Sequence, residues 1–287
     1  MPKKIRQRWV LLRQSFQILR AHKRLALLVA INKILRLVVL SLVAAPLYLA
    51  IVSTNSNDFS FIAEKMGINI HNPWLYIVVL TLYLIAHLIT LFCYAALLDA
   101  TIRYFRTGHL SLMTGIRSAT HIFWKLYVWA LLNSTLGFLI RLLDFYFKRF
   151  EWCIDLLVGG SWTVSTYFVL PVLVVEKPSP WGAIKRSIQL LRHTWGQSLL
   201  LNFTSSSIFF FLLIIACAPL LIGLKMGGLL PGATGAVITV PLVMLVNLFN
   251  STMGLILNAA LYVYAADGKV PNMYEEAAIK EAFMASK

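Results

Sequence analysis

The stretch WLYIVVLTLYLIAHLITLFCYAALL, residues 74–98, decides the fold class because it contains no Asp, Glu, Lys or Arg. A bilayer core about 30 Å thick is crossed by roughly 20 helical residues, so this stretch is long enough to span it. Other uncharged runs follow along the chain at 37–52, 126–140, 156–175, 193–224 and 226–266. The two shorter runs, 37–52 and 126–140, reach spanning length across flanking charges that snorkel to the interface. We predict an all-α integral membrane protein with six transmembrane helices, near 28–52, 73–98, 123–145, 154–175, 198–223 and 237–264.

The beginning of the last uncharged run carries turn-forming residues. Its first ten residues include Gly227, Gly228, Pro231, Gly232 and Gly235. Gly and Pro are the strongest local signals for turns. We therefore expect a loop there, followed by a single spanning helix.

The composition excludes the other broad classes of protein. Of the 287 residues, 59% are hydrophobic and 13% are charged, whereas soluble domains are roughly one quarter charged. The 17 Phe, 11 Tyr and 8 Trp argue against disorder, because such residues favour burial. Three cysteines, Cys93, Cys153 and Cys217, lie in or beside apolar segments without paired spacing, so neither a disulfide framework nor a zinc site is predicted.

The basic charge predicts both orientation and partners. The formal net charge is +15, and the charges lie in short blocks between apolar runs, which favours anionic phospholipids over nucleic acid. Of the 26 Lys and Arg, 21 fall on one side of the predicted spans and 5 on the other. By the positive-inside rule both termini should be cytoplasmic, and an even number of spans agrees with this.

Short segments of the chain resemble one another. Residues 13–20, RQSFQILR, match residues 185–192, KRSIQLLR, position by position, and a weaker copy begins at Ile116-Arg117-Ser118. The span ends 95–98, AALL, and 259–262, AALY, also match. We interpret the chain as a single membrane domain of three repeat-like units, each a basic amphipathic interfacial helix followed by a two-span hairpin. The units cover about 1–98, 99–175 and 176–264, followed by a cytoplasmic tail over 265–287. Chance similarity is the alternative interpretation.

The segments that lead two of these units have helical periodicity. Ile5, Trp9, Leu12, Phe16 and Leu19 are spaced three or four residues apart and form one apolar face. In the last unit this spacing recurs in Trp181, Ile184, Ile188 and Leu191. A helix with such a face and basic residues opposite lies in the head-group plane, although packing on the protein itself is the alternative. The predicted lipid-binding residues are Arg6, Arg13, Arg20, Lys185, Arg186 and Arg192.

A family resemblance rests on residues 167–196. The run Tyr-Phe-Val-Leu-Pro-Val-Leu-Val-Val-Glu at 167–176, then GAIKRS at 182–187 and Trp195-Gly196, resembles a signature of uncharacterised bacterial six-span membrane proteins of the DUF6159 type. YciC-like proteins are loosely similar. The resemblance implies a protein of the bacterial cytoplasmic (inner) membrane, and it implies no activity.

Catalytic chemistry is not indicated. No carboxylate lies in the centre of a predicted span, and no metalloprotease, nucleophile-elbow or phosphate-loop motif occurs. His87 is the only histidine deep in a span. It is a functional candidate or, more commonly, a histidine hydrogen-bonded to a neighbouring helix. We expect no enzyme activity, no metal and no cofactor.

In the predicted spans, side-chain amides and hydroxyls are more numerous than ionisable groups. Such residues in lipid either join helices or line a wet path. Two functions therefore remain: a passive permeation pathway for an ion or small solute, which we narrowly favour, and a non-conducting protein that binds anionic lipid or organises the membrane. A homo-oligomer is compatible with either. The predicted polar path comprises His87, Asn133, Asn202, Asn247, Asn250, Ser251 and Asn258.

Overall fold

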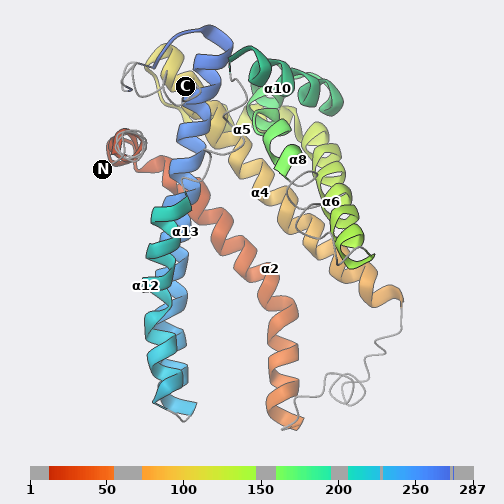
Figure 1. Ribbon diagram of the computed structural model, residues 1–287, viewed down its shortest axis with the longest axis vertical. Coiled ribbons are helices and arrows are strands. Elements are labelled where there is room, and N and C mark those ends of the chain that lie inside the picture. The colour runs from red at the N-terminus through yellow and green to blue at the C-terminus, as the bar shows by residue number, and fades with distance from the viewer. Residues whose placement is uncertain are drawn as a thin grey trace.

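The computed structural model describes residues 13–54, 73–146, 160–194, 206–226, 229–271 and 274, and within these ranges every regular element is a helix (Figure 1). A short helix over residues 13–21 comes first. The helices that follow it, with their bounds, are α2 (Arg24–Thr54), α4 (Pro73–Thr107), α5 (Leu112–His121), α6 (Phe123–Tyr146), α8 (Gly160–Ser165), α9 (Val169–Val175), α10 (Pro180–Thr194), α12 (Ser206–Lys225) and α13 (Leu229–Asp267).

Within the described residues, two helices contain segments long and apolar enough to cross a membrane, Leu80–Thr107 and Val237–Asp267. Two shorter apolar helical segments, Ser161–Val175 and Phe211–Gly223, lie in the regions of other predicted spans. The all-helical fold agrees with the sequence analysis, and the long apolar helices support the membrane class. The count of six spans and their arrangement as three hairpins stay predictions.

The fourth predicted span is divided in the structure. Its residues 154–159 lie outside the described residues, and the remainder forms α8 and α9 with a turn at 166–168 between them. The Phe168 amide, just before α9, donates a hydrogen bond to the Ser187 side chain of α10 (3.1 Å). A side chain from another helix thus satisfies a backbone donor near the break, as a buried interruption of a helix requires.

The predicted loop before the last span is wrong, because α13 begins at Leu229 and continues through Gly232, Gly235 and Pro241. Pro231 lies in the first helical turn, where a missing amide hydrogen costs nothing. A Cβ on Gly235 would come within 2.6 Å of the Pro219 carbonyl oxygen of α12. Packing against α12 therefore requires this glycine inside a helix, a role that local turn propensity does not reveal.

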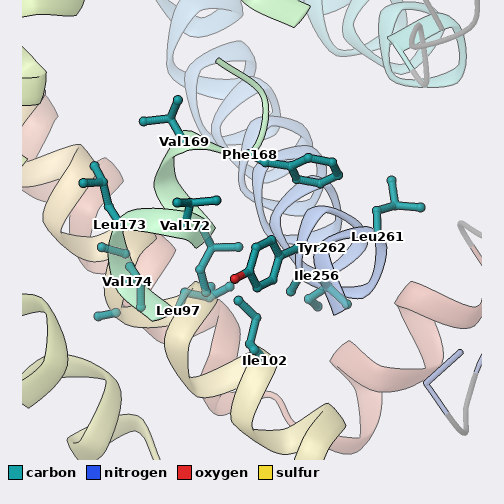
Figure 2. Packing of buried hydrophobic residues seen from close by; sticks show 14 of the residues in the cluster. Leu97, Ile102, Phe168, Val169, Val172, Leu173, Val174, Ile256, Leu261 and Tyr262 are labelled. Carbon is teal, nitrogen blue, oxygen red and sulfur yellow. The ribbon is translucent and has the colours of Figure 1, made fainter. Parts of the chain in front are cut away.

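The core lies where α4, α9 and α13 meet. Figure 2 shows Tyr262 of α13 beside Val172 of α9, near Leu97 of α4, with its hydroxyl directed toward α9. All three residues are fully buried. The matching segments 95–98 and 259–262 are both completely buried in this core.

The opposite end is more open. Toward the bottom of Figure 1, α2 diverges from the α12–α13 pair. Large apolar side chains on these helices are solvent-exposed, as expected for surfaces that contact lipid tails. They include Leu37, Val38, Leu42, Phe211, Ile215, Leu221, Val237, Ile238 and Leu245.

Candidate functional site

Three short amphipathic segments gather at one end of the molecule, which we call the basic end. They are the helix over 13–21, α5 and α10, and Figure 1 shows all three in its upper part. α5 packs along α4, and α10 packs on α9 and α13. These helices therefore rest on the core formed by α4, α9 and α13.

Each of these helices turns its aligned serine inward. Ser15, Ser118 and Ser187 are all buried. The Ser15 hydroxyl lies 2.8 Å from the Tyr274 hydroxyl, and Ser187 accepts the Phe168 amide hydrogen bond. Ser118 Oγ has no partner among the described residues. The aligned serine is thus buried in all three helices. In two of them its hydroxyl forms a hydrogen bond with another described residue.

The predicted apolar stripes divide between the core and the outside. Leu19 in the first helix, and Ile184 and Leu191 in α10, are buried. Phe16 and Trp181 of the same stripes are 44% and 59% exposed. Ile5, Trp9 and Leu12 lie outside the described residues. Each described helix therefore packs on the protein and still presents one large aromatic side chain outward.

Further large apolar side chains are exposed at the basic end. Met113 of α5 and Trp124 of α6 are 73% and 71% exposed, and Phe123 is 46% exposed. Trp124 stacks on Tyr127 with ring centroids 5.3 Å apart. Aromatic side chains of this kind are enriched at the membrane–water interface, where their apolar rings meet the head groups.

The described carboxylates of the basic end are all paired with arginines. Asp99 accepts a hydrogen bond from Arg103 at 2.7 Å. Asp267, at the end of α13, binds Arg106 of α4 through two hydrogen bonds of 2.8 and 2.9 Å. These carboxylates are therefore unavailable to neutralise other basic residues nearby.

Glu176 forms the third such pair and links three helices. It accepts hydrogen bonds from Arg186 of α10 at 3.1 and 3.2 Å. The hydroxyl of Tyr262, from α13, lies 3.1 Å from the same carboxylate. Because Glu176 directly follows α9, this cluster connects α9, α10 and α13 through one charged group.

The other predicted lipid-binding residues are free of such pairs. Arg13, Arg20, Lys185 and Arg192 are exposed and form no ion pair within the described part of the chain. Arg186 is half-buried and held by Glu176, and Arg6 lies outside the described residues. Arg117 of α5, which the sequence analysis did not single out, is also exposed and without an ion pair among the described residues. The basic end therefore presents a surplus of positive charge.

The structure does not place the described residues of the predicted polar path in one cluster. Asn133 accepts a hydrogen bond from the Trp162 indole at 3.1 Å, which joins α6 to α8. Asn258 donates to the Tyr167 carbonyl at 3.0 Å, while its side-chain oxygen is buried without a partner among the described residues. Two of the predicted path amides therefore join helices.

The remaining path residues differ in environment. Asn247 is exposed, whereas Asn250 and Ser251 are half-buried, and none of the three side chains forms a hydrogen bond within the described residues. His87 stacks parallel to Tyr83, and its Nε2 is buried without a partner in the described part of the chain. Asn202 lies outside the described residues.

Two polar contacts were not anticipated from the sequence. Thr90 of α4 donates to Asn32 Oδ1 of α2 at 3.1 Å, and Asn32 is almost fully buried. The position of Asn32, between Ile31 and Lys33 and within a mostly apolar stretch, is a signal that the sequence did contain. Tyr274 is buried against Phe105. Burial raises the pKa of its hydroxyl above the ordinary value, although the bond to Ser15 acts the other way.

Metal binding has no visible basis at this site. Among the residues that the structure describes, no three His, Cys, Asp or Glu side chains gather closely enough to hold an ion.

The comparisons with known proteins give one result. A family model described as "Family of unknown function (DUF6159)" matches residues 74–272, more than two thirds of the chain. No curated protein and no solved structure matches the chain.

Proposed function

Because the chain belongs to the DUF6159 family, whose function is unknown, we propose a function from the geometry of the basic end. We propose that this is a non-enzymatic multi-pass membrane protein that binds anionic phospholipid head groups and thereby organises the surrounding membrane. The observation that carries the proposal is the juxtaposition, on the amphipathic helices, of exposed unpaired basic residues and exposed large apolar side chains.

The electrostatics support an anionic ligand. Each Lys or Arg close to an anionic membrane surface contributes about 1 kcal/mol of binding free energy. The described carboxylates at this end are already paired, so Arg13, Arg20, Lys185 and Arg192 keep their charge for an external partner. Phosphate oxygens accept hydrogen bonds from guanidinium groups in bidentate fashion, which favours lipid phosphates as that partner.

The apolar contacts support a membrane surface rather than a soluble anion. Trp181 is exposed on α10, the helix that also carries Lys185 and Arg192. A soluble anion would engage the charges and leave the indole in water. A membrane surface engages both, because the ring enters the acyl boundary while the basic groups reach the head groups.

The test measures the lipid shell of the full-length protein. Reconstitution into mixed phosphatidylglycerol and phosphatidylcholine nanodiscs with a labelled anionic lipid reports the enrichment of that lipid around the protein. Replacing Arg13, Arg20, Lys185 and Arg192 by Gln should reduce this enrichment by about fivefold or more, since even 1 kcal/mol corresponds to roughly that factor. Lys225→Gln, an exposed lysine that ends α12, serves as the control for loss of charge away from the amphipathic helices. Unchanged enrichment in the fourfold variant would refute the proposal.

We also propose that the basic end faces the cytoplasm of a bacterial cell, on the strength of the 21-to-5 distribution of Lys and Arg. Single cysteines at Ser56 and Lys148 should then react with an impermeant thiol reagent from outside, whereas cysteines at Thr107 and Ser179 should not. The reverse labelling pattern would overturn this orientation.

A permeation pathway is the second candidate. It is supported by the side chains of Asn247, Asn250 and Ser251, which form no hydrogen bond within the described residues. If these groups line a solute path, ion or solute flux into liposomes should be lost in a variant that combines Asn247→Leu and Asn250→Leu. Absence of flux with the wild-type protein would exclude this candidate.

A further inference from the structure

We propose that a second copy of this chain docks on α13 through a surface formed by Asn247, Ser251 and Gly254, which we call the amide face. The proposal concerns the middle of α13 and does not depend on lipid binding at the basic end.

Over residues 252–260, the side by which α13 packs on its own chain lies opposite the amide face. With 3.6 residues per turn, Asn247, Ser251 and Gly254 fall within about 60° of one another around the helix axis. The buried residues on that opposite side are Thr252, Met253, Ile256, Ala259 and Ala260. About two turns beyond Gly254, Leu261 and Tyr262 are buried on the same side as the amide face. Over this stretch of α13, the described residues that pack on the helix therefore lie mainly on the side away from Asn247, Ser251 and Gly254.

The surface is open. Asn247 and Gly254 are exposed, and a Cβ built on Gly254 would have no atom within 4 Å. Val240, one heptad before Asn247, is 51% exposed. Positions 240, 247 and 254 therefore form an exposed row with a seven-residue period.

An exposed amide in this segment requires a partner. Asn247 lies within Val237–Asp267, one of the two long apolar spans, and its amide forms no hydrogen bond in the described part of the chain. Lipid tails neither donate nor accept hydrogen bonds, so an amide facing them is left unsatisfied. Polar side chains in membrane helices are commonly satisfied across a helix–helix contact.

A second copy is the occupant that fits best. Copies inserted in the same orientation are parallel, and a two-fold axis along the membrane normal would set each Asn247 opposite its equivalent. An amide both donates and accepts, so two asparagines complement each other. The seven-residue period suits a parallel helix pair, and Gly254 allows the two backbones to approach closely.

Cysteine cross-linking of the full-length protein in liposomes tests the arrangement. In a background with Cys93, Cys153 and Cys217 replaced by Ala, Asn247→Cys and Gly254→Cys should form disulfide-linked dimers on oxidation. Phe249→Cys is the matched control, because it is also exposed and lies at similar depth on the far side of α13. It should cross-link much less at a high ratio of lipid to protein.

The second measurement is resonance energy transfer between copies of the protein that carry fluorescent labels outside α13. Asn247→Leu should weaken association roughly three- to tenfold, the effect of losing one or two interhelical hydrogen bonds. Equal cross-linking at positions 247 and 249, or unchanged association of Asn247→Leu, would overturn the proposal. Rapid reaction of Asn247→Cys with a polar thiol reagent, without dimer formation, would also overturn it and favour a water-filled path.

Discussion

The three aligned serines should differ in their contributions to stability, although all three are buried. Ser187→Ala removes the acceptor of the hydrogen bond that the buried Phe168 amide donates. Such a loss costs about 1–3 kcal/mol. Ser15→Ala removes the partner of the Tyr274 hydroxyl, with an expected cost of about 1 kcal/mol. Ser118→Ala removes a hydroxyl that has no partner among the described residues, so it should be neutral or stabilising.

Thermal unfolding of the full-length protein in detergent, followed by tryptophan fluorescence, can separate these cases. A change of 1 kcal/mol shifts the midpoint of a domain of 150–250 residues by about 2–4 °C, and a chain of this size should respond similarly. Ser187→Ala should therefore lower the midpoint by at least about 2 °C, and Ser118→Ala should not lower it. Alanine favours helix more than serine by a similar amount at all three sites, so this effect cancels in the comparison.

The comparison between the variants is the decisive measurement. If Ser118→Ala lowers the midpoint as much as Ser187→Ala, the hydroxyls are not distinguished by their hydrogen bonds. The assignment of Ser118 as an unpaired group would then be wrong. If Ser187→Ala has no effect, the turn between α8 and α9 does not depend on α10.

Tyr262→Phe keeps the buried ring but removes the hydroxyl that donates a hydrogen bond to Glu176. It should destabilise the protein by about 1–2 kcal/mol; the cost stays this small because the carboxylate is partly solvated. An unchanged unfolding midpoint would show that this contact contributes nothing. Gly115→Ala should cost about 1–3 kcal/mol, since its Cβ would come within 2.2 Å of the Ala96 carbonyl oxygen. Gly254→Ala, which meets open space, is its control and should leave the unfolding midpoint of the isolated monomer unchanged or raise it slightly, because alanine favours a helix more than glycine does.

Much of the fold followed from the length and polarity of the apolar runs. Uninterrupted runs such as 74–98 require burial in lipid or protein, and α4 contains this run in full. The loop expected at 226–236 was wrong because Gly and Pro were judged by local propensity alone. In α13, packing against α12 outweighs that propensity at Gly235.

The site was only partly predictable. The match between residues 13–20 and 185–192 identified Ser15 and Ser187 as equivalent positions, but their inward direction depends on which side of each helix meets the core. The ion pair between Arg106 and Asp267 joins residues 161 positions apart. No local pattern indicates such a pair, since it exists only because α4 and α13 pack together.

Anchoring of the amphipathic helices to the core affects how they would bind lipid. Ser187, Leu190 and Leu191 hold α10 against the protein, and Ser15 and Leu19 hold the first helix in the same way. A segment that folds on binding must offset the entropy of ordering, whereas a helix that is already packed does not. Anionic lipid should therefore bind without a change in helix content, and circular dichroism of the full-length protein in neutral and anionic nanodiscs should give the same helical signal. A clear gain of helix with anionic lipid would show that these segments order only at the membrane, and that the packed arrangement is not the form that binds.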